Sequence, residues 1–142
     1  MTHPAVKLVD LRETGLEVGE VVDALDDDAS GGLTLFVGRV RDHDGNKGVT
    51  GLHYDAHPSA LEKLQEVADR VAEEYDVRGV AAVHRIGTLA IGDVAVIVAT
   101  TASHRGDAFA ASRALIDTLK ATVPIWKHQR FADGTDEWVG AP

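Results

Sequence analysis

The segment from Val94 to Thr101 (VAVIVATT) is an almost continuous run of apolar and β-branched residues. A run this short and this apolar is typical of a strand that is buried on both faces. Such a strand needs cover from other elements on each face. Because helical patterns occur before and after it, the sequence predicts an α+β fold with helices packed on a mainly antiparallel sheet. No repeat or low-complexity linker divides the 142 residues, so we expect one domain over 1–142.

The first part of the chain predicts a helix, two strands and a turn. Valine and leucine residues at helical spacing indicate a short helix over residues 18–25. Residues 33–40 and 49–56 are rich in β-forming residues. The segment between them, Asp42 to Gly48 (DHDGNKG), consists of residues that favour tight turns. We therefore expect these two strands to pair as a hairpin.

Two longer helices are predicted from their apolar faces. The first begins after Pro58 and ends near Tyr75, and Ser59 with Glu62 matches a capping box. The second covers residues 106–121, just before a proline. The expected inner faces are Leu61, Leu64, Val67, Val71 and Tyr75 in the first helix, and Phe109, Ser112, Leu115, Ile116 and Leu119 in the second. A strand over 80–86, a turn at 92–93 and a short strand near the C-terminus complete the pattern.

The composition excludes several classes of function. The chain carries 14 Lys and Arg against 23 Asp and Glu, a net charge of −9, so we expect no nucleic-acid binding. It has no cysteine, which excludes disulfides, thiolate metal sites and cysteine nucleophiles, and fits a cytoplasmic location. The sequence predicts neither a membrane helix nor a signal peptide. His53 and His57 lie on a predicted strand and do not form the helical zinc motif, so we predict no metal and no cofactor.

Several cationic residues lie at the ends of predicted elements. Arg39 and Arg41 end a strand, His104-Arg105 precedes the last helix, Lys120 lies in its last turn, and Lys127 follows it. If the fold gathers these ends, the cluster suits a phosphate or another dense anion. Each residue also has a simpler interpretation. Arginines on one strand face can be solvated, the histidine can bond to a backbone carbonyl, and the helix dipole favours a C-terminal lysine.

Four segments and a C-terminal pattern together resemble the MoaE family, the large catalytic subunit of molybdopterin synthase. Each segment alone is a weak signal, but all occur in order and at the family's spacing, from about Leu8 to Val139. The segments are FVGRVRDHDGNKGV (36–49), LHYDAHPSA (52–60), VHRIGTLAIGDVAVIVATTASHRGDAF (83–109) and IDTLKATVPIWK (116–127), followed by Asp133, Gly134 and Trp138.

The resemblance implies a hammerhead-like α+β fold and a sulfurtransferase of molybdenum cofactor biosynthesis. The reaction converts cyclic pyranopterin monophosphate into molybdopterin by inserting two sulfurs as a dithiolene. The sulfur comes from a small ubiquitin-like subunit, expected as a separate chain, whose C-terminal Gly-Gly carries a thiocarboxylate. The resemblance also implies a homodimer of this chain with one carrier at each end, forming a heterotetramer. The lack of cysteine agrees with this chemistry, because this subunit need not carry sulfur itself.

The resemblance also implies roles for the cationic residues. Arg39 and Arg41 match the family's strand end and are expected to bind substrate. His104-Arg105 matches its His-Arg pair and is expected to meet the pterin phosphate, from the same or the neighbouring subunit. Lys120 and Lys127 match the lysines of DxLK and PxWK and are the expected catalytic residues. Each amine could act as a general acid/base or stabilise an oxyanion.

One departure from the family pattern follows the second lysine. The family usually has a basic residue and Glu there, whereas this chain has His128 and Gln129, which we also expect in the substrate site. Gln can hydrogen-bond but cannot act as a base. This change favours an alternative, a non-catalytic paralogue that binds a pterin or the carrier without turnover. Retention of Lys120 and Lys127 favours the enzyme, and a purely structural domain leaves the cations unexplained.

Overall fold

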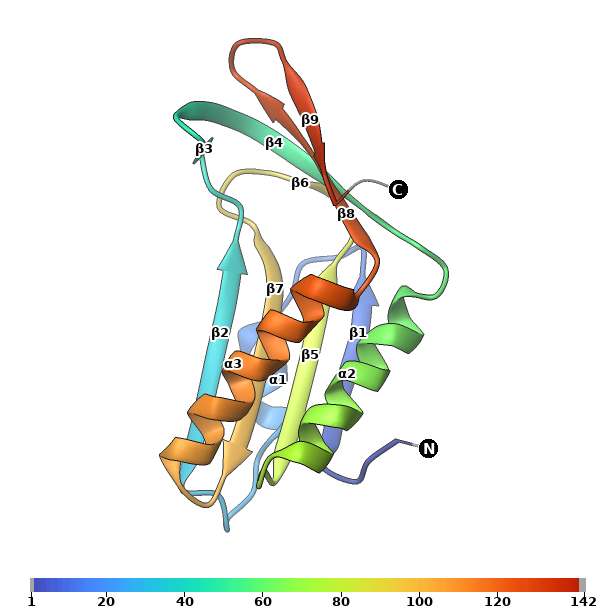
Figure 1. Ribbon diagram of the computed structural model, residues 1–142. Coiled ribbons are helices and arrows are strands. Elements are labelled where there is room, and N and C mark those ends of the chain that lie inside the picture. The colour runs from blue at the N-terminus through green and yellow to red at the C-terminus, as the bar shows by residue number, and fades with distance from the viewer. Residues whose placement is uncertain (1, 141–142) are drawn as a thin grey trace.

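The computed structural model describes residues 2–140, so Met1 and the last two residues lie outside the description. This range contains three helices and runs of successive, mostly antiparallel strands, which confirms the predicted α+β class (Figure 1). The helices are α1 (Val18–Ala24), α2 (Ala60–Glu74) and α3 (Arg105–Thr122). The strands are β1 (Val6–Arg12), β2 (Gly32–Arg39), β3 (His43–Asp44), β4 (Lys47–Ala56), β5 (Gly79–Arg85), β6 (Gly87–Leu89), β7 (Val94–Ala102), β8 (Ile125–Phe131) and β9 (Asp136–Val139).

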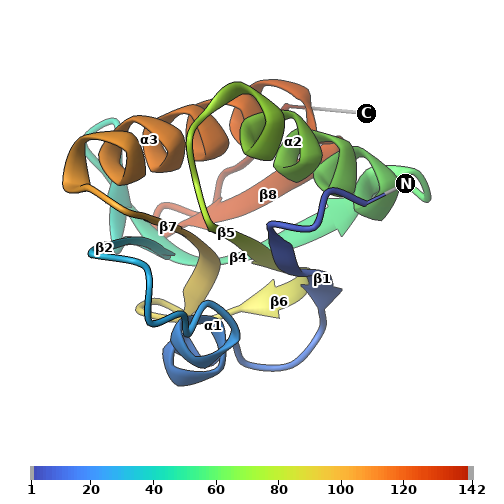
Figure 2. The ribbon, with the colours of Figure 1, turned by 90° about the horizontal axis from the view of Figure 1, so that it is seen from below.

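The larger sheet has four strands in the order β1-β5-β7-β2. β7 is antiparallel to both of its neighbours, while β1 and β5 are parallel. Every residue of β7 after Val94 is buried. α2 and α3 cover one face of this sheet and α1 covers the other (Figure 2). The prediction of a central strand with cover on both faces is therefore confirmed.

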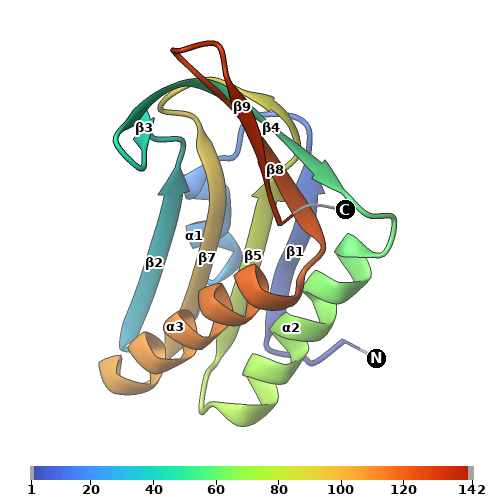
Figure 3. The same ribbon diagram turned by 45° about the horizontal axis from the view of Figure 1, so that its top comes forward.

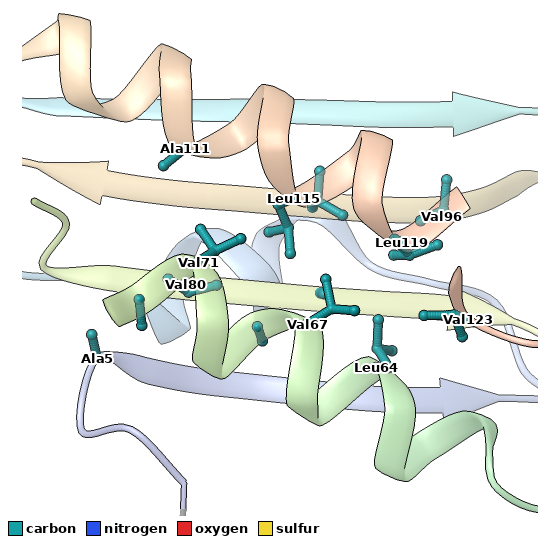
Figure 4. Packing of buried hydrophobic residues seen from close by; sticks show 14 of the residues in the cluster. Ala5, Leu64, Val67, Val71, Val80, Val96, Ala111, Leu115, Leu119 and Val123 are labelled. Carbon is teal, nitrogen blue, oxygen red and sulfur yellow. The ribbon is translucent and has the colours of Figure 1, made fainter. Parts of the chain in front are cut away.

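The main core lies between the two long helices and the larger sheet. Leu64 of α2 and Leu115 of α3 are fully buried and point toward the strands, where Val80 and Val96 lie (Figure 4). Two residues predicted for the inner faces are instead exposed, Leu61 and Phe109. Leu61 is 44% exposed in the first turn of α2. Phe109 is 64% exposed because it lies on the side of α3 next to β2, which is the last strand of the sheet.

A group of buried hydroxyls fixes α3 to the sheet. The Thr100 hydroxyl donates to the Ala108 carbonyl at 2.8 Å and lies 2.8 Å from the Ser112 hydroxyl. Thr34 of β2 lies 2.6 Å from the same Ser112 hydroxyl and also donates to the Ala108 carbonyl, at 2.9 Å. These bonds satisfy polar groups that would be costly to bury alone. They hold α3 at one position across β7 and β2.

The second sheet lies across one end of the larger sheet (Figure 3). Its strand order is β3-β4-β8-β9, and β6 pairs with β4 beside this path. The final strand β9 confirms the short strand predicted near the C-terminus. α3 leads directly into β8, so the C-terminal end of this helix lies next to the second sheet (Figure 1).

The predicted hairpin between residues 33–40 and 49–56 was wrong. β2 pairs with β7 in the larger sheet, whereas β4 pairs with β8 in the second. The turn residues instead close a smaller hairpin, in which Asp44 pairs with Lys47. Gly45 and Asn46 both have positive φ, 54° and 69°, as a two-residue turn of this kind requires. The turn residues were therefore predicted correctly, but the strand that precedes the turn is the short β3 and not the strand over 33–40.

The predicted capping box at the start of α2 is also wrong. Ser59 is the N-cap residue, but no side-chain bond caps the helix. Its φ of −85° and ψ of 0° are helical, whereas a capping side chain needs an extended backbone. The Ser59 hydroxyl instead lies 2.9 Å from Nδ1 of His57. The predicted helix itself is confirmed.

Candidate active site

A cavity of about 180 Å³ lies where the end of α3 meets the second sheet. Lys120 enters it from the last turn of α3, and Lys127 enters it from β8. Pro124 ends the helix between them, so a short turn brings the two amines to one cavity although they belong to different elements. The other lining residues are Tyr54, His84, Leu119, Val123, Ile125, Val139 and Gly140. The structure thus brings together the two residues predicted to be catalytic.

The Lys120 amine is electrostatically unusual. Its pKa is lowered, first by desolvation and then by the positive charge of Lys127. The side chain nevertheless remains open to solvent, so the amine can exchange protons. An amine with a lowered pKa is available as a base closer to neutral pH than an ordinary lysine. The pair therefore offers a proton-transfer group beside a second amine.

His84 is a residue of this cavity that the sequence analysis missed. It lies on β5, is 3% exposed, and desolvation lowers its pKa to about 4. Its Nδ1 lies 2.6 Å from the Arg85 carbonyl, which can only accept, so Nδ1 carries the ring proton. The Nε2 atom of the neutral ring is then left as a hydrogen-bond acceptor. The imidazole thus supplies an uncharged acceptor to a cavity that also holds two amines.

Tyr54 of β4 was also missed by the sequence analysis. It is the cross-strand partner of Lys127, which places both side chains on the same face of the second sheet. Its ring meets the His84 ring edge to face at a centroid distance of 4.8 Å. Burial raises the pKa of the phenol, so it stays protonated. Both rings belong to the sequence segments that carry the family resemblance, but only strand pairing places them beside the lysines.

The two predicted arginines lie at the end of β2 that faces the second sheet (Figure 1). Arg39 is exposed and its Nε donates to the Gly92 carbonyl at 3.2 Å. Arg41 is 66% exposed, and its Nη2 lies 3.7 Å from Oδ1 of Asp44. Neither lines the lysine cavity. Their guanidinium groups remain largely open for an anion arriving from solvent.

His104 and Arg105 do not reach this cavity within one chain. They lie at the start of α3, whereas Lys120 lies in its last turn. At 1.5 Å per residue, a helix of 18 residues is about 27 Å long. The hypothesis that all the cationic element ends of one chain meet at one place was therefore wrong. Both side chains are exposed beside the start of β2.

The last two predicted site residues point to opposite faces of β8. His128 stacks on Trp138 with ring centroids 4.6 Å apart, and its Nε2 lies 2.6 Å from Oδ2 of Asp136. Gln129 is 2% exposed and shares the face of Lys127, because alternate residues of a strand share a face. Its amide donates to the carboxylates of Asp44 and Glu137. Gln129 is therefore the residue of this pair that lies on the side of the cavity.

The described part of the chain contains neither a cluster of metal-ligating side chains nor a membrane-spanning helix. Among residues 2–140, no group of three or more His, Asp or Glu side chains is arranged to hold a metal ion. No helix in the same range is both long and apolar enough to cross a bilayer.

Known proteins match this chain in sequence over nearly its whole length. The family model described as MoaE protein matches residues 11–122. Molybdopterin synthase catalytic subunit 1 of Mycobacterium tuberculosis is 41% identical over 131 residues, covering 92% of this chain and 88% of that protein. The molybdopterin synthase catalytic subunit of Halalkalibacterium halodurans is 37% identical over 131 residues, covering 92% of this chain and 83% of that protein.

Solved structures agree with the sequence matches. Molybdopterin synthase from Staphylococcus aureus superposes with a TM-score of 0.84 at 30% identity, covering 94% of this chain and 96% of that chain. The MoaE protein from Burkholderia ambifaria superposes with a TM-score of 0.79 at 34% identity, covering 93% of this chain and 88% of that chain. The resemblance inferred from the sequence is confirmed by both kinds of comparison. The chain belongs to the MoaE family.

Proposed function

We propose that this chain is the catalytic subunit of a molybdopterin synthase and transfers sulfur to cyclic pyranopterin monophosphate. The observation that carries the proposal is the pair of amines, Lys120 and Lys127, in one cavity beside the neutral imidazole of His84. The names of the relatives support the same reaction. The sulfur donor is the thiocarboxylate of a small carrier subunit, because this chain has no cysteine to carry sulfur.

The two amines suit the charge changes of such a transfer. Moving sulfur from a thiocarboxylate to a carbon of the pterin builds negative charge on an oxygen, which a protonated amine stabilises. Bonds to oxygen must also be broken on the pterin, and the leaving oxygens need protons. Lys120, whose pKa is lowered, fits the proton-transfer role, and Lys127 fits the charge-stabilising role. Cytoplasmic localisation belongs to the same proposal.

The carrier subunit is a second chain in this proposal. A chain with a TM-score of 0.69 at 20% identity comes from a protein–protein complex of subunits 1 and 2 of molybdopterin-converting factor from Helicobacter pylori. The shared fold allows a complex of the same kind here. Val139 and Gly140, at the end of the described chain, form part of the cavity wall. An extended Gly-Gly tail is slim enough to enter a cavity of this size.

A homodimer would complete the anion site. A groove of about 460 Å³ is lined by Leu33, Leu35, Phe36, Phe109 and Ile116, and four of these side chains are at least 38% exposed. It runs along β2, whose outer edge has no neighbouring strand within the described residues. A second copy packed there in antiparallel orientation would place its own His104 and Arg105 near the lysine cavity of the first. These cations could then bind the pterin phosphate.

The dimer is tested by the molar mass in solution. Phe109→Glu places a charge in the groove and should convert the native dimer into a monomer in light scattering. Lys63→Glu reverses a charge on an exposed side chain of α2, which does not line the groove, and should leave the dimer intact. A native protein that scatters at the mass of one chain would reject the dimer.

The enzymatic proposal is tested by reconstitution. The native chain, a thiocarboxylated Gly-Gly carrier and cyclic pyranopterin monophosphate should together form molybdopterin. Lys120→Ala and Lys127→Ala should each abolish product, whereas Lys63→Ala, at an exposed lysine on α2, should not. All variants should keep the native melting temperature. A folded native chain that binds the carrier but forms no product would instead favour the non-catalytic paralogue.

A further inference from the structure

The carboxylate of Asp44 links three groups on the cavity side of the second sheet. Its Oδ2 accepts a hydrogen bond from the Gln129 amide at 2.6 Å, while its Oδ1 lies 3.7 Å from Nη2 of Arg41. The positive charges of Lys127 and Arg41 also act on it. Among the described residues, Asp44 is thus the one acidic side chain that contacts both Arg41, an expected substrate-binding residue, and the strand that carries Lys127.

The backbone fixes this carboxylate in place. Asp44 lies in β3, where it pairs with Lys47 across the two-residue turn at 45–46. On the other side, Gln129 lies in the middle of β8, between β4 and β9, and is 2% exposed. A buried amide has few alternative partners, so its bond to Asp44 is hard to replace. The carboxylate is therefore held by a rigid partner rather than by a flexible surface side chain.

We propose that Asp44 is a positioning residue of the active site, which orients Arg41 through a carboxylate that Gln129, on the strand of Lys127, holds in place. This proposal rests on the function proposed above. It also gives a physical meaning to Gln129, where the family usually has Glu. The carboxylate is not lost from this part of the site but is supplied by β3, and the amide has become its hydrogen-bond donor.

Gln129 also keeps a third carboxylate away from this position. Its amide donates to Glu137 as well, at 2.5 Å, so it already lies between two carboxylates. A Glu at 129 would place a third carboxylate against them, and like charges at hydrogen-bond distance raise one another's pKa values. Changing Gln129 back to the family residue should therefore impair this chain unless Asp44 and Glu137 change with it.

The test is a charge exchange measured by steady-state turnover. Asp44→Asn keeps an acceptor oxygen for Gln129 but removes the charge, so kcat/KM should fall about 10- to 100-fold without a change in melting temperature. Gln129→Glu alone should also be impaired. The triple variant D44N/Q129E/E137Q restores one carboxylate between two amides and should recover most of the lost rate. Asp55→Asn makes the same change at an exposed position, on the face of β4 opposite Tyr54. This variant should have the kcat/KM of the native chain.

Two results would overturn the proposal while leaving the proposed function intact. The first is native kcat/KM in Asp44→Asn. The second is a triple variant D44N/Q129E/E137Q that is no more active than Gln129→Glu. A loss of activity that follows the melting temperature in every variant would also reject a positioning role.

A readout without turnover separates this proposal from the function on which it rests. The pKa of the Asp44 carboxyl lies below its ordinary value, first because of the Gln129 amide and then because of Lys127, Arg41 and His43. Carboxyl-carbon NMR titration should find this low value in the native chain and a higher one in Arg41→Ala. An Asp44 that titrates identically in both proteins would show that it does not interact with Arg41. This titration tests the role of Asp44 even if the native chain makes no molybdopterin. A native chain without product would reject only the proposed function.

Discussion

At the scale of single residues, His84 is the group whose protonation should be most visible in stability. Its pKa is lowered from 6.5 to about 4 in the folded chain. Below about pH 6.5 the imidazole therefore binds a proton in the unfolded chain, whereas in the folded chain it stays neutral down to about pH 4. The free energy of unfolding consequently falls as the pH falls. This loss of stability is complete below the pKa of His84 in the folded chain, and it is absent above the pKa of His84 in the unfolded chain.

This penalty can be isolated with His84→Gln, which cannot titrate. Between about pH 7 and pH 4, the free energy of unfolding of the native chain should fall by about 3 kcal/mol more than that of the variant. Carboxylates titrate in both proteins, so their contribution cancels in the comparison. Urea denaturation at each pH measures the difference. Parallel pH profiles for the two proteins would mean that His84 titrates normally in the folded chain.

Which site residues the sequence predicts depends on how local their signal is. Lys120 and Lys127 flank a helix-ending proline, so their neighbourhood is visible in a short segment. His84 and Asp44 have no such signal, because the residues that they meet in the site, Tyr54 and Gln129, come from strands far away in the sequence. Asp44 meets Gln129 across 85 positions. Its role appears only when β4 and β8 pair.

At the scale of elements, Gly38 decides how closely β2 approaches β7. A Cβ atom at this position would lie 2.6 Å from Cγ1 of Val96, a buried side chain on β7. The ladder also shifts register just after Gly38, which directs the following residues toward the second sheet. Gly38→Ala should therefore lower the free energy of unfolding by about 1–3 kcal/mol through overpacking.

Gly19→Ala is the matched comparison for this change. Nothing lies within 4 Å of its added Cβ, and Gly19 is in α1. Because alanine has the higher helix propensity, stability should stay the same or rise by up to about 1 kcal/mol. Urea denaturation of both variants measures the contrast. Equal stability of Gly38→Ala and the native chain would show that the close approach is not a constraint.

The elements themselves were largely predictable, whereas their pairing was not. The apolar run of β7 and the faces of α2 and α3 are local patterns, and their existence was confirmed. The partner of β2 was wrong because two strands joined by turn residues usually form a hairpin. Here the turn belongs to β3 and β4, and β4 pairs with β8, whose paired residues lie about 70 to 80 positions later in the sequence. Local residue patterns carry no signal for that pairing.

At the scale of the whole molecule, the proposed dimer makes each active site depend on two chains. Lys120→Ala would remove the catalytic amine from one chain, and a double His104→Ala, Arg105→Ala variant would remove the phosphate cations from the other. Each variant alone should be inactive. A mixture that exchanges subunits at random should regain about a quarter of native turnover, because half of the dimers are mixed and each of these has one intact site.

The mixture also contains its own control. If His104 and Arg105 served the site of their own chain, mixed dimers would contain no intact site and would be as inactive as the two parent variants. Affinity tags on the two variants establish that mixed dimers have formed. No recovery in a mixture with proven exchange would contradict the shared site and would leave the role of Lys120 unaffected.

The central claim is that the cavity holding Lys120 and Lys127 performs sulfur transfer. The most direct measurement uses mass spectrometry to monitor the loss of thiocarboxylate from the carrier during a single turnover with cyclic pyranopterin monophosphate. The native chain and Lys63→Ala should convert the carrier to its carboxylate in step with molybdopterin formation. Lys120→Ala should bind the carrier and leave it thiocarboxylated. Native-rate loss of thiocarboxylate in folded Lys120→Ala would contradict the account.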